Sequence, residues 1–298
     1  MRLNKISLCD KQVFDKYLLL KKHRLCAYSF SNIYIWRKLF SISWAIINDS
    51  LCVFFKDKIG VFLYLPPLSK EASSDTIRSL FDILAKLNKN PSFAHIDNVE
   101  EEEVSFYRAL GYDSSLPSRE YIFIRRDLEE LKGKRFKSKR ASYNYFVKNF
   151  KYTCQPISLK DRVECLSLYY LWAGQRKALS KDSFYCGMLD DSGVILKEAF
   201  NQYSLLGFEG ILVRVKGKVK AFTFGFKLNE ETFCILYEIT DLTCKGLAQF
   251  IFAEFCSQLK PYTFINIMDD SGLDNLRRVK LSYYPQSLLS AYSIRRYD

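Results

Sequence analysis

The chain has 298 residues, a formal net charge of +12, and 48% hydrophobic and 16% aromatic residues. This composition excludes global disorder, because such a chain can bury a sizeable core. It contains no apolar run of 18 residues that would span a membrane, and its first residues lack the apolar stretch of a secretory signal. We therefore expect a cytoplasmic protein, with the membrane surface as a peripheral location open to it.

The excess of positive charge favours an anionic partner: RNA, a phospholipid surface or a phosphorylated donor. A basic surface that is simply solvated is the alternative. Nine cysteines and two histidines are scattered along the chain, and no two cysteines form a C-x-x-C pair. This pattern predicts neither a disulfide framework nor a metal site, and it marks no cysteine as an activated nucleophile.

Residues 1–126 are predicted to form the first of two mixed α/β halves. Strands come first, separated by the turn signals Asn48-Asp49 and Asp57-Lys58. An amphipathic helix capped by Ser74 or Asp75 follows, then a strand, a helix that ends at Gly111, and a closing strand. The expected strands are 44–47, 51–55, 60–65, 93–99 and 121–125, and the expected helices are 75–87 and 100–110.

Residues 127–152 are predicted to form a basic helical linker. Aromatic residues recur in it at helical spacing, which predicts a docked apolar face beneath a dense positive charge. We expect it to bind the phosphates of tRNA or of lipid headgroups. The residues expected to do so are Lys134, Arg135, Lys137, Lys139 and Arg140. A solvated charged helix that merely joins the two halves is the alternative.

Residues 153–298 repeat the same order of elements, at an offset of roughly 170 residues, which predicts tandem domains. Two helices precede Gly207, and strands, a helix after Gly246, a strand and a last helix follow. The expected strands are 211–215, 220–227, 233–239 and 264–268, and the last helix is 273–283.

The candidate site follows the central strand of this second half. Glu238 and Asp241 end that strand, and Gly246-Leu247-Ala248 opens the next helix, where small residues let backbone N–H groups approach an anion or a carbonyl. This layout resembles motif A of the GCN5-related N-acetyltransferase (GNAT) fold, with Thr243 where Gln or Arg is usual. The matching turn of the first half, 66–69, begins with two prolines that offer no N–H. The working site is therefore expected in the second half.

Three longer passages are similar to the C-terminal domain of phosphatidylglycerol lysyltransferases. They are CAYSFSNIYIW (26–36), DLEELKGKRFKSKRASYNYFVKNF (127–150) and FINIMDDSGLDNLRRVKLSYYP (264–285). The last resembles the family pattern Y-I-N-x-x-x-D-x-G-x-x-x-L-R-x-x-K-x-S-Y-x-P. The resemblance implies tandem GNAT-like acyltransferase domains of mixed α/β class and the transfer of an aminoacyl group from charged tRNA to a lipid hydroxyl or an amine.

Acyl transfer needs a proton acceptor and a donor for the developing oxyanion. We assign Glu238, Asp241 and Lys280 to these catalytic roles. The expected substrate-binding residues are Asn266, Asp270, Arg277, Gly246 and Ala248. Structural roles are the alternatives: Asp270 could cap the last helix, and Arg277 could pair with Asp274 or Glu238.

The leading hypothesis is an aminoacyl- or acyltransferase with aminoacyl-tRNA as its donor substrate and no resident cofactor. An acyl-CoA-dependent N-acetyltransferase is the second hypothesis. A non-catalytic protein that binds RNA or another anion is the third. The sequence leaves the acceptor, the amino acid and the oligomeric state open.

Overall fold

The structure is a computed structural model that describes residues 3–71 and 73–296. The chain divides into two compact units. Unit 1 comprises the described parts of Met1–Tyr121, Met268–Arg277 and Leu288–Asp298, and unit 2 comprises Ile122–Ile267 and Arg278–Ser287. This division differs from the three consecutive segments that we expected, 1–126, 127–152 and 153–298. The basic segment belongs to unit 2, and two stretches near the C-terminus return to unit 1.

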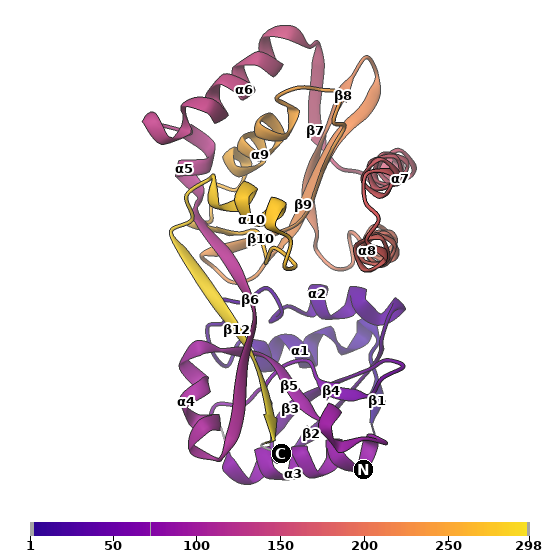
Figure 1. The fold of residues 1–298 in the computed structure, drawn as a ribbon, viewed down its shortest axis with the longest axis vertical. Coiled ribbons are helices and arrows are strands. Elements are labelled where there is room, and N and C mark those ends of the chain that lie inside the picture. The colour runs from indigo at the N-terminus through magenta and orange to yellow at the C-terminus, as the bar shows by residue number, and fades with distance from the viewer. Residues whose placement is uncertain (1–2, 72, 297–298) are drawn as a thin grey trace. The chain divides into compact units, whose positions relative to one another are not determined.

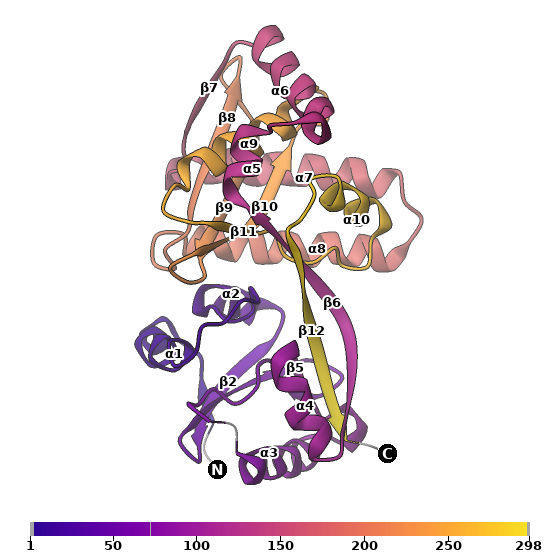
Figure 2. The ribbon, with the colours of Figure 1, turned by 90° about the vertical axis from the view of Figure 1, so that its left-hand side faces the viewer.

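Unit 1 is built around a mixed sheet. Its strands lie in the order β1-β2-β3-β4-β5-β12-β6, and β4 runs parallel to β5. The last strand, β12, pairs antiparallel with β5, from Ala291 opposite Glu100 to Arg295 opposite His95; it lies between β5 and β6 (Figure 2). The strands are β1 Asn4–Lys5, β2 Ser41–Ile47, β3 Ser50–Lys56, β4 Val61–Leu63, β5 His95–Glu100, β6 Tyr112–Ile124 and β12 Ser287–Arg296.

Helices of unit 1 complete its core. The predicted amphipathic helix is confirmed as α3, whose apolar face is buried at Ile77, Leu80 and Leu84 because these residues recur at helical spacing. Its cap is Ser73, one residue before the predicted position. The sequence reading did not predict α1, α2 or β12. The helices are α1 Lys11–Leu18, α2 Phe30–Ile35, α3 Ser74–Leu87 and α4 Glu101–Ala109, with 3-10 turns η1 Leu8–Asp10, η2 Trp36–Lys38 and η3 Pro91–Phe93.

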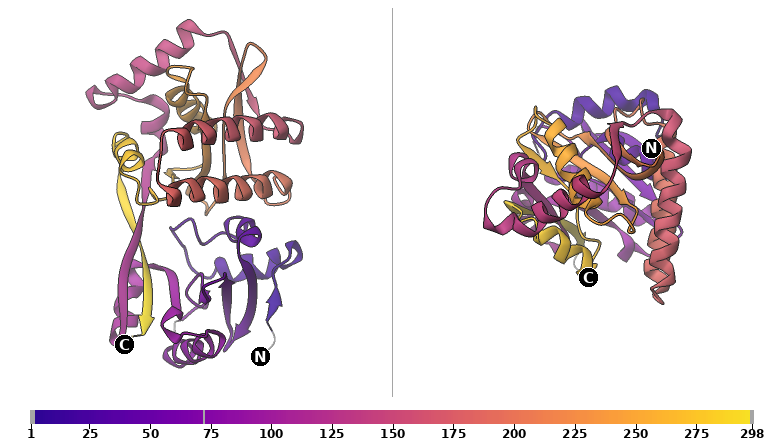
Figure 3. Two further views of the ribbon diagram at one scale, coloured as in Figure 1. Left: turned by 45° about the vertical axis from the view of Figure 1, so that its right-hand side comes forward. Right: turned by 90° about the horizontal axis from the view of Figure 1, so that it is seen from above.

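The sheet strands of unit 2 lie in the order β11-β10-β9-β8-β7, and the end of β6 pairs antiparallel with β11, so that β1 to β12 belong to one hydrogen-bonded sheet. Only β10 and β11 run parallel among the strands β7 to β11. Helices α5, α6 and α9 cover one face of this sheet, and α7 and α8 cover the other (Figures 1 and 3). The strands are β7 Tyr152–Pro156, β8 Glu209–Val215, β9 Lys218–Lys227, β10 Thr232–Thr240 and β11 Phe264–Asn266. The helices are α5 Arg125–Glu130, α6 Lys137–Asn149, α7 Arg162–Ala178, α8 Ser183–Asn201 and α9 Leu247–Gln258, with 3-10 turns η4 Lys134–Phe136 and η5 Leu159–Asp161; α10, Asp274–Leu281, begins in unit 1 and ends in unit 2.

An irregularity in β10 sets the direction of the side chains of Tyr237 and Glu238. The register with β9 shifts between Ile235 and Tyr237. Beyond this bulge the Tyr237 hydroxyl donates to the Ser192 carbonyl of α8 at 2.7 Å. Because successive side chains of a strand point to opposite faces, Glu238 points to the face covered by α9. None of the described helices combines the length and apolar character needed to cross a bilayer.

Candidate functional site

The C-terminal part of β10 has a neighbouring strand on only one side. β10 pairs with β11 from Thr232 to Cys234, and β11 then ends at Asn266. The pairing with β9 continues to Thr240. Backbone groups of β10 beyond Cys234 therefore lack β11 as a partner on this side. Glu238 lies in this stretch.

The carboxyl group of Glu238 has an unusually high pKa. Its side chain is accessible to solvent, yet the protein packed around it removes much of its hydration. This desolvation raises its pKa to about 8, and the positive charge of Lys280 acts in the opposite direction. The charge on Glu238 in turn contributes to raising the pKa of the buried Tyr283. A carboxyl with a pKa near neutral exchanges protons readily at physiological pH.

Lys280 lies on α10 and is buried. Its Nζ donates to the carbonyl of Ile267 at 2.6 Å. This bond ties α10 to the segment that leaves β11, directly after Asn266, which is itself fully buried. The structure thus gathers three of the predicted site residues, Glu238, Asn266 and Lys280, in unit 2 around the end of β10 and β11.

Asp241 follows Glu238 closely in sequence but has a different environment. It forms an ion pair of 2.6 Å with Lys220, and its Oδ1 accepts hydrogen bonds from the Thr243 hydroxyl and backbone N–H. Burial alone would raise its pKa, but these bonds outweigh burial and hold the pKa below its ordinary value. These contacts explain Asp241 as a turn-forming residue, and they make it a weak proton acceptor.

Gly246 is explained by close packing. It adopts a left-handed φ of +86°, and a Cβ built there would lie 2.1 Å from the Ser142 carbonyl oxygen of α6. Glycine therefore lets α6 approach the start of α9, whether or not a ligand binds. Ala248 occupies the first turn of α9 and is partly exposed. Their predicted role in holding a donor stays a prediction.

Asp270 and Arg277 form a separate cluster in unit 1. Asp270 accepts hydrogen bonds from the Tyr121 hydroxyl at 2.5 Å, from Arg277 Nε at 3.1 Å and from the Gly272 N–H at 3.0 Å. Burial opposes ionisation, but these donors outweigh it and lower the pKa of Asp270. Arg277 also lies 3.6 Å from Asp274. The anticipated structural pairing of Arg277 with Asp274 is present, and the pairing with Asp270 is shorter.

The basic segment is a turn followed by a helix, and most of its predicted anion ligands have partners within the chain. Arg135 pairs with Asp127 at 2.6 Å. Lys139 donates to the Ser282 hydroxyl at 2.7 Å and lies 4.1 Å from the centre of the Tyr283 ring. Arg140 donates to the carbonyls of Leu131 and Gly133.

Lys134 and Lys137 remain as the predicted anion ligands that point outward. Both are exposed, and neither forms an ion pair with any of the described side chains. The part of the basic segment available to an anionic partner is therefore smaller than the sequence suggested.

The sequence analysis missed a buried network in unit 1. Glu120, on β6, accepts hydrogen bonds from the backbone N–H of Cys26 at 2.9 Å and from its thiol at 2.8 Å. The amide of Asn32 donates to the Cys26 carbonyl at 3.0 Å. The available sequence signal for this network was the position of Glu120, directly before the apolar end of a predicted strand. Tyr121, the partner of Asp270, carried no signal beyond its place in a predicted strand.

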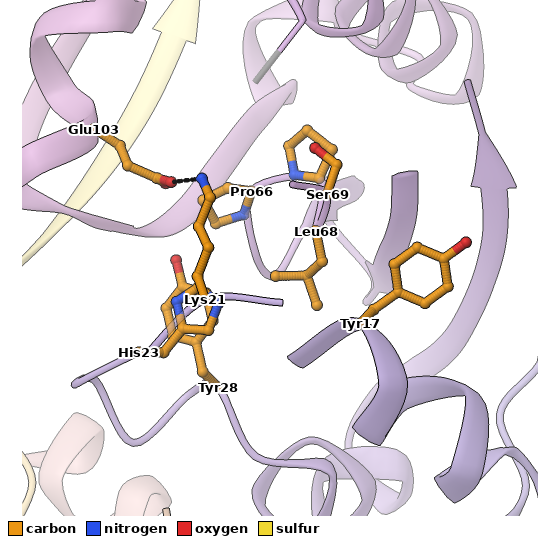
Figure 4. Close-up of a pocket in the computed structure, with 9 residues that line it drawn as sticks. Tyr17, Lys21, His23, Tyr28, Pro66, Leu68, Ser69 and Glu103 are labelled. Carbon is orange, nitrogen blue, oxygen red and sulfur yellow. Dashed lines mark hydrogen bonds and ion pairs between the residues drawn. The ribbon is translucent and has the colours of Figure 1, made fainter. Parts of the chain in front are cut away.

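A pocket in unit 1 lies beside the proline turn, and it encloses about 230 Å³ including open solvent (Figure 4). Its polar side chains are already paired: Lys21 with Glu103 at 3.0 Å, and His23 with Glu100 at 3.0 Å. His23 also stacks on Tyr28 with ring centres 3.9 Å apart. We therefore do not regard it as the reaction site. Across the described residues, no group of three or more His, Cys, Asp or Glu side chains is arranged to hold a metal ion.

Comparison with protein families identifies one that covers most of the chain. The family described as "Phosphatidylglycerol lysyltransferase, C-terminal" matches residues 19–295. No curated protein matches the chain.

Comparison with solved structures supports the fold. A conserved protein of unknown function from Bacteroides thetaiotaomicron VPI-5482 is 27% identical over 100% of both chains, with a TM-score of 0.88. L-PGS from Bacillus licheniformis is 16% identical over 98% of this chain and 93% of its own, with a TM-score of 0.69. FemX is 11% identical over 98% and 97%, with a TM-score of 0.61. A tandem GNAT protein from the clavulanic acid biosynthesis pathway has a TM-score of 0.56, at 7% identity over 98% and 97%. The predicted mixed α/β, tandem GNAT-like fold is confirmed.

Proposed function

The chain belongs to the phosphatidylglycerol lysyltransferase C-terminal family, and from this premise we propose that it is an aminoacyltransferase. The proposed donor is aminoacyl-tRNA, and the proposed acceptor is a lipid hydroxyl or an amine. The observation that carries the proposal is the raised pKa of Glu238, a solvent-accessible carboxyl group on the part of β10 that no longer pairs with β11.

The proposed reaction is a direct transfer. The acceptor oxygen or nitrogen attacks the carbonyl carbon of the aminoacyl ester, and the bond from that carbon to the ribose oxygen of the tRNA breaks. Glu238 takes the proton from the acceptor and returns it to the leaving ribose oxygen, so that the carboxylate is regenerated. Positioning of the two substrates supplies much of the acceleration, and no covalent intermediate with the protein is required.

Lys280 contributes its charge. A positive group beside Glu238 stabilises the carboxylate form, which is the form that accepts a proton. The same charge stabilises the negative oxygen that develops on the attacked carbonyl. Because Lys280 Nζ donates a hydrogen bond to the Ile267 carbonyl, its charge is held in place before substrate arrives.

Lys134 and Lys137 are proposed to bind phosphates of the tRNA. Both are exposed on the segment that precedes and opens α6. Phosphate contacts of this kind release counterions, so they weaken as salt is added.

The proposal is tested by transfer of a labelled amino acid from charged tRNA to a lipid extract and to small amines. We expect product with the wild-type protein, and a higher KM for tRNA in Lys134→Ala/Lys137→Ala. The matched control is Lys148→Ala/Lys151→Ala, which removes two exposed lysines from the same segment. Equal tRNA binding by the two double variants would exclude this tRNA site.

The two alternative functions are separate outcomes of the same assay. Transfer from acyl-CoA, with none from charged tRNA, would establish an N-acyltransferase. Binding of tRNA without transfer from any donor would leave a non-catalytic RNA-binding protein.

A further inference from the structure

Tyr284 follows helix α10 and leaves its ring half exposed to solvent. Its φ is +59°, in the left-handed region that favours glycine, so the backbone is strained at this residue. Its N–H donates to the Leu281 carbonyl at 2.9 Å, which closes the turn after the helix. The side chain is 47% exposed, so burial of the ring offsets little of the strain. A bulky residue in such a conformation points to a role for its side chain.

The neighbours of Tyr284 fix its ring without covering it. The buried ring of Phe136 makes a T-shaped contact with it, with ring centres 5.7 Å apart and planes at 89°. The guanidinium of Arg135 lies 5.5 Å from the centre of the Tyr284 ring and is anchored by its ion pair with Asp127. Among the described residues, no other ring contacts Tyr284. The ring therefore has a set position and an exposed surface on which a planar group can stack.

Positive charge surrounds this ring. Lys134 and Lys137 flank Arg135 and Phe136 in the 3-10 turn η4 and at its end, and both lysines are exposed. Side chains three residues apart in such a turn lie one above the other, so the two lysines share a side. Residues 131–160 contain no aspartate or glutamate.

The acidic residues that precede this segment are already paired within the chain. Residues 125–137 hold six basic and three acidic side chains, which leaves the segment positive. Each of the three acids lies within 3.0 Å of an arginine or lysine. The pairs are Asp127 with Arg135, Glu129 with Arg125, and Glu130 with both Arg126 and Lys132. An anion that approaches Tyr284 therefore meets lysines whose charge is not cancelled by these acids.

The combination of an exposed ring and lysines is typical of proteins that bind unpaired nucleic acid. Bases stack on the aromatic ring, and the lysines contact the phosphates between them. A bilayer would need a wide apolar face instead. The exposed aliphatic residues of α10, Val279 and Leu281, are two residues apart and so point to different sides of the helix. They do not form such a face, and the surface fits a nucleic acid better than a membrane.

We infer that Tyr284 stacks on an unpaired base of the donor tRNA, while Lys134 and Lys137 hold the adjacent phosphates. The aminoacyl group of a charged tRNA is attached at its unpaired 3′ end, so a base stacked there would fix the end of the donor that reacts. The inference rests on the proposed function, because it names the part of the donor that the chain contacts.

Binding of two RNA hairpins tests the inference. One ends in an unpaired CCA, and the other has the same stem with a blunt end. Wild type should bind the CCA hairpin more tightly than the blunt one. Tyr284→Gly should bind the CCA hairpin roughly 5- to 150-fold more weakly than wild type does, the usual effect of losing one stacked base. It should bind the blunt hairpin like wild type, because the lysines remain.

Two further variants separate stacking from structure. Glycine suits the left-handed φ, so Tyr284→Gly should keep the fold, which its melting temperature checks. Tyr284→Phe keeps the ring and should bind the CCA hairpin like wild type. Tyr145→Ala is the matched control, since Tyr145 is 41% exposed and has Lys245 Nζ 4.8 Å from its ring centre, but lies about two turns of α6 beyond Lys137. It should also bind like wild type.

Several results would overturn the inference. Wild type without a preference for the CCA hairpin would do so, as would Tyr284→Gly with the preference intact. Equal losses in Tyr284→Phe and Tyr284→Gly would assign the effect to the hydroxyl group and not to stacking. Binding to anionic vesicles that depends on Tyr284, with no binding to either hairpin, would assign the surface to a bilayer.

The hairpin result is independent of catalysis. A preference for the CCA hairpin that depends on Tyr284, without aminoacyl transfer, would leave the stacking site standing and defeat the proposed function. Transfer from charged tRNA with the same KM in wild type and Tyr284→Gly would do the reverse.

Discussion

The end of β10 and the turn before α10 both place a carboxyl group beside a cation, yet the two carboxyl groups have opposite properties. Glu238 is accessible, its pKa is raised, and the charge of Lys280 only partly offsets the desolvation. Asp270 is buried among three donors, and its pKa is lowered. Asp241, three residues after Glu238, resembles Asp270 in this respect.

The difference shows that an acidic residue at a strand end acquires its role from its hydrogen-bond donors. A carboxylate with several donors is stabilised in its charged form and holds a turn together. A carboxyl with few donors in a crowded environment retains its proton near neutral pH and can exchange it. By this criterion we propose Glu238 as the proton acceptor, and we propose structural roles for Asp241 and Asp270.

The largest expected effect is on catalysis at Glu238. Glu238→Gln keeps the shape of the side chain and removes the proton acceptor, so turnover should fall by about 10²–10⁴-fold, the usual contribution of a general base. Asp241→Asn is the comparison. It should lower the melting temperature, because it breaks the ion pair with Lys220, and it should lower turnover much less than Glu238→Gln does. If the two variants lose turnover equally, the distinction between these acids is wrong.

The next effect concerns Lys280. Lys280→Ala should reduce turnover by on the order of 100-fold, since it removes a charge that stabilises the developing oxyanion. It should also move the pH at which Glu238 ionises upward, because the nearby positive charge is lost. Lys260→Ala removes an exposed lysine of the same unit as a control. A reduced turnover with an unshifted pH profile would restrict Lys280 to holding the Ile267 segment.

The smallest effect is on stability at Asp270. Asp270→Asn should lower the free energy of unfolding by about 1–3 kcal/mol, because hydrogen bonds to a charged group are lost or weakened. Asp274→Asn, at the exposed and longer contact with Arg277, should change it by less than about 0.5 kcal/mol. Denaturant unfolding measures both values. A turnover loss at Asp270 without a stability loss would return this residue to the substrate site.

Sequence periodicity predicted the elements whose burial is regular. The helix over Ser74–Leu87 and the strands β8, β9 and β10 follow from alternating or helical patterns of apolar residues. The strand β12 was not predicted, because Ser287–Arg296 mixes polar and apolar residues and pairs with a strand far earlier in the chain. Its return also made the units discontinuous, which no local pattern encodes.

The sequence led to a predicted site position, but it could not show the contacts that surround the residues of that site. Glu238 and Lys280 were identified from their place after a strand and within a motif. The partners of Asp241, Arg135 and Lys139 arise from residues brought close by folding, so the sequence could not reveal that these charges are already paired. The φ of Gly246 and its approach to Ser142 likewise depend on how α6 packs.

The pH dependence of transfer tests the central claim most directly. Because the pKa of Glu238 is raised to about 8, its base form increases as the pH rises through that value. We expect kcat/KM for wild type to increase with pH and to level off above a midpoint near this pKa, and we expect Glu238→Gln to lose this step. A wild-type profile that is flat from pH 6 to 9, or a step that persists unchanged in the variant, would contradict the assignment of Glu238 as the proton acceptor.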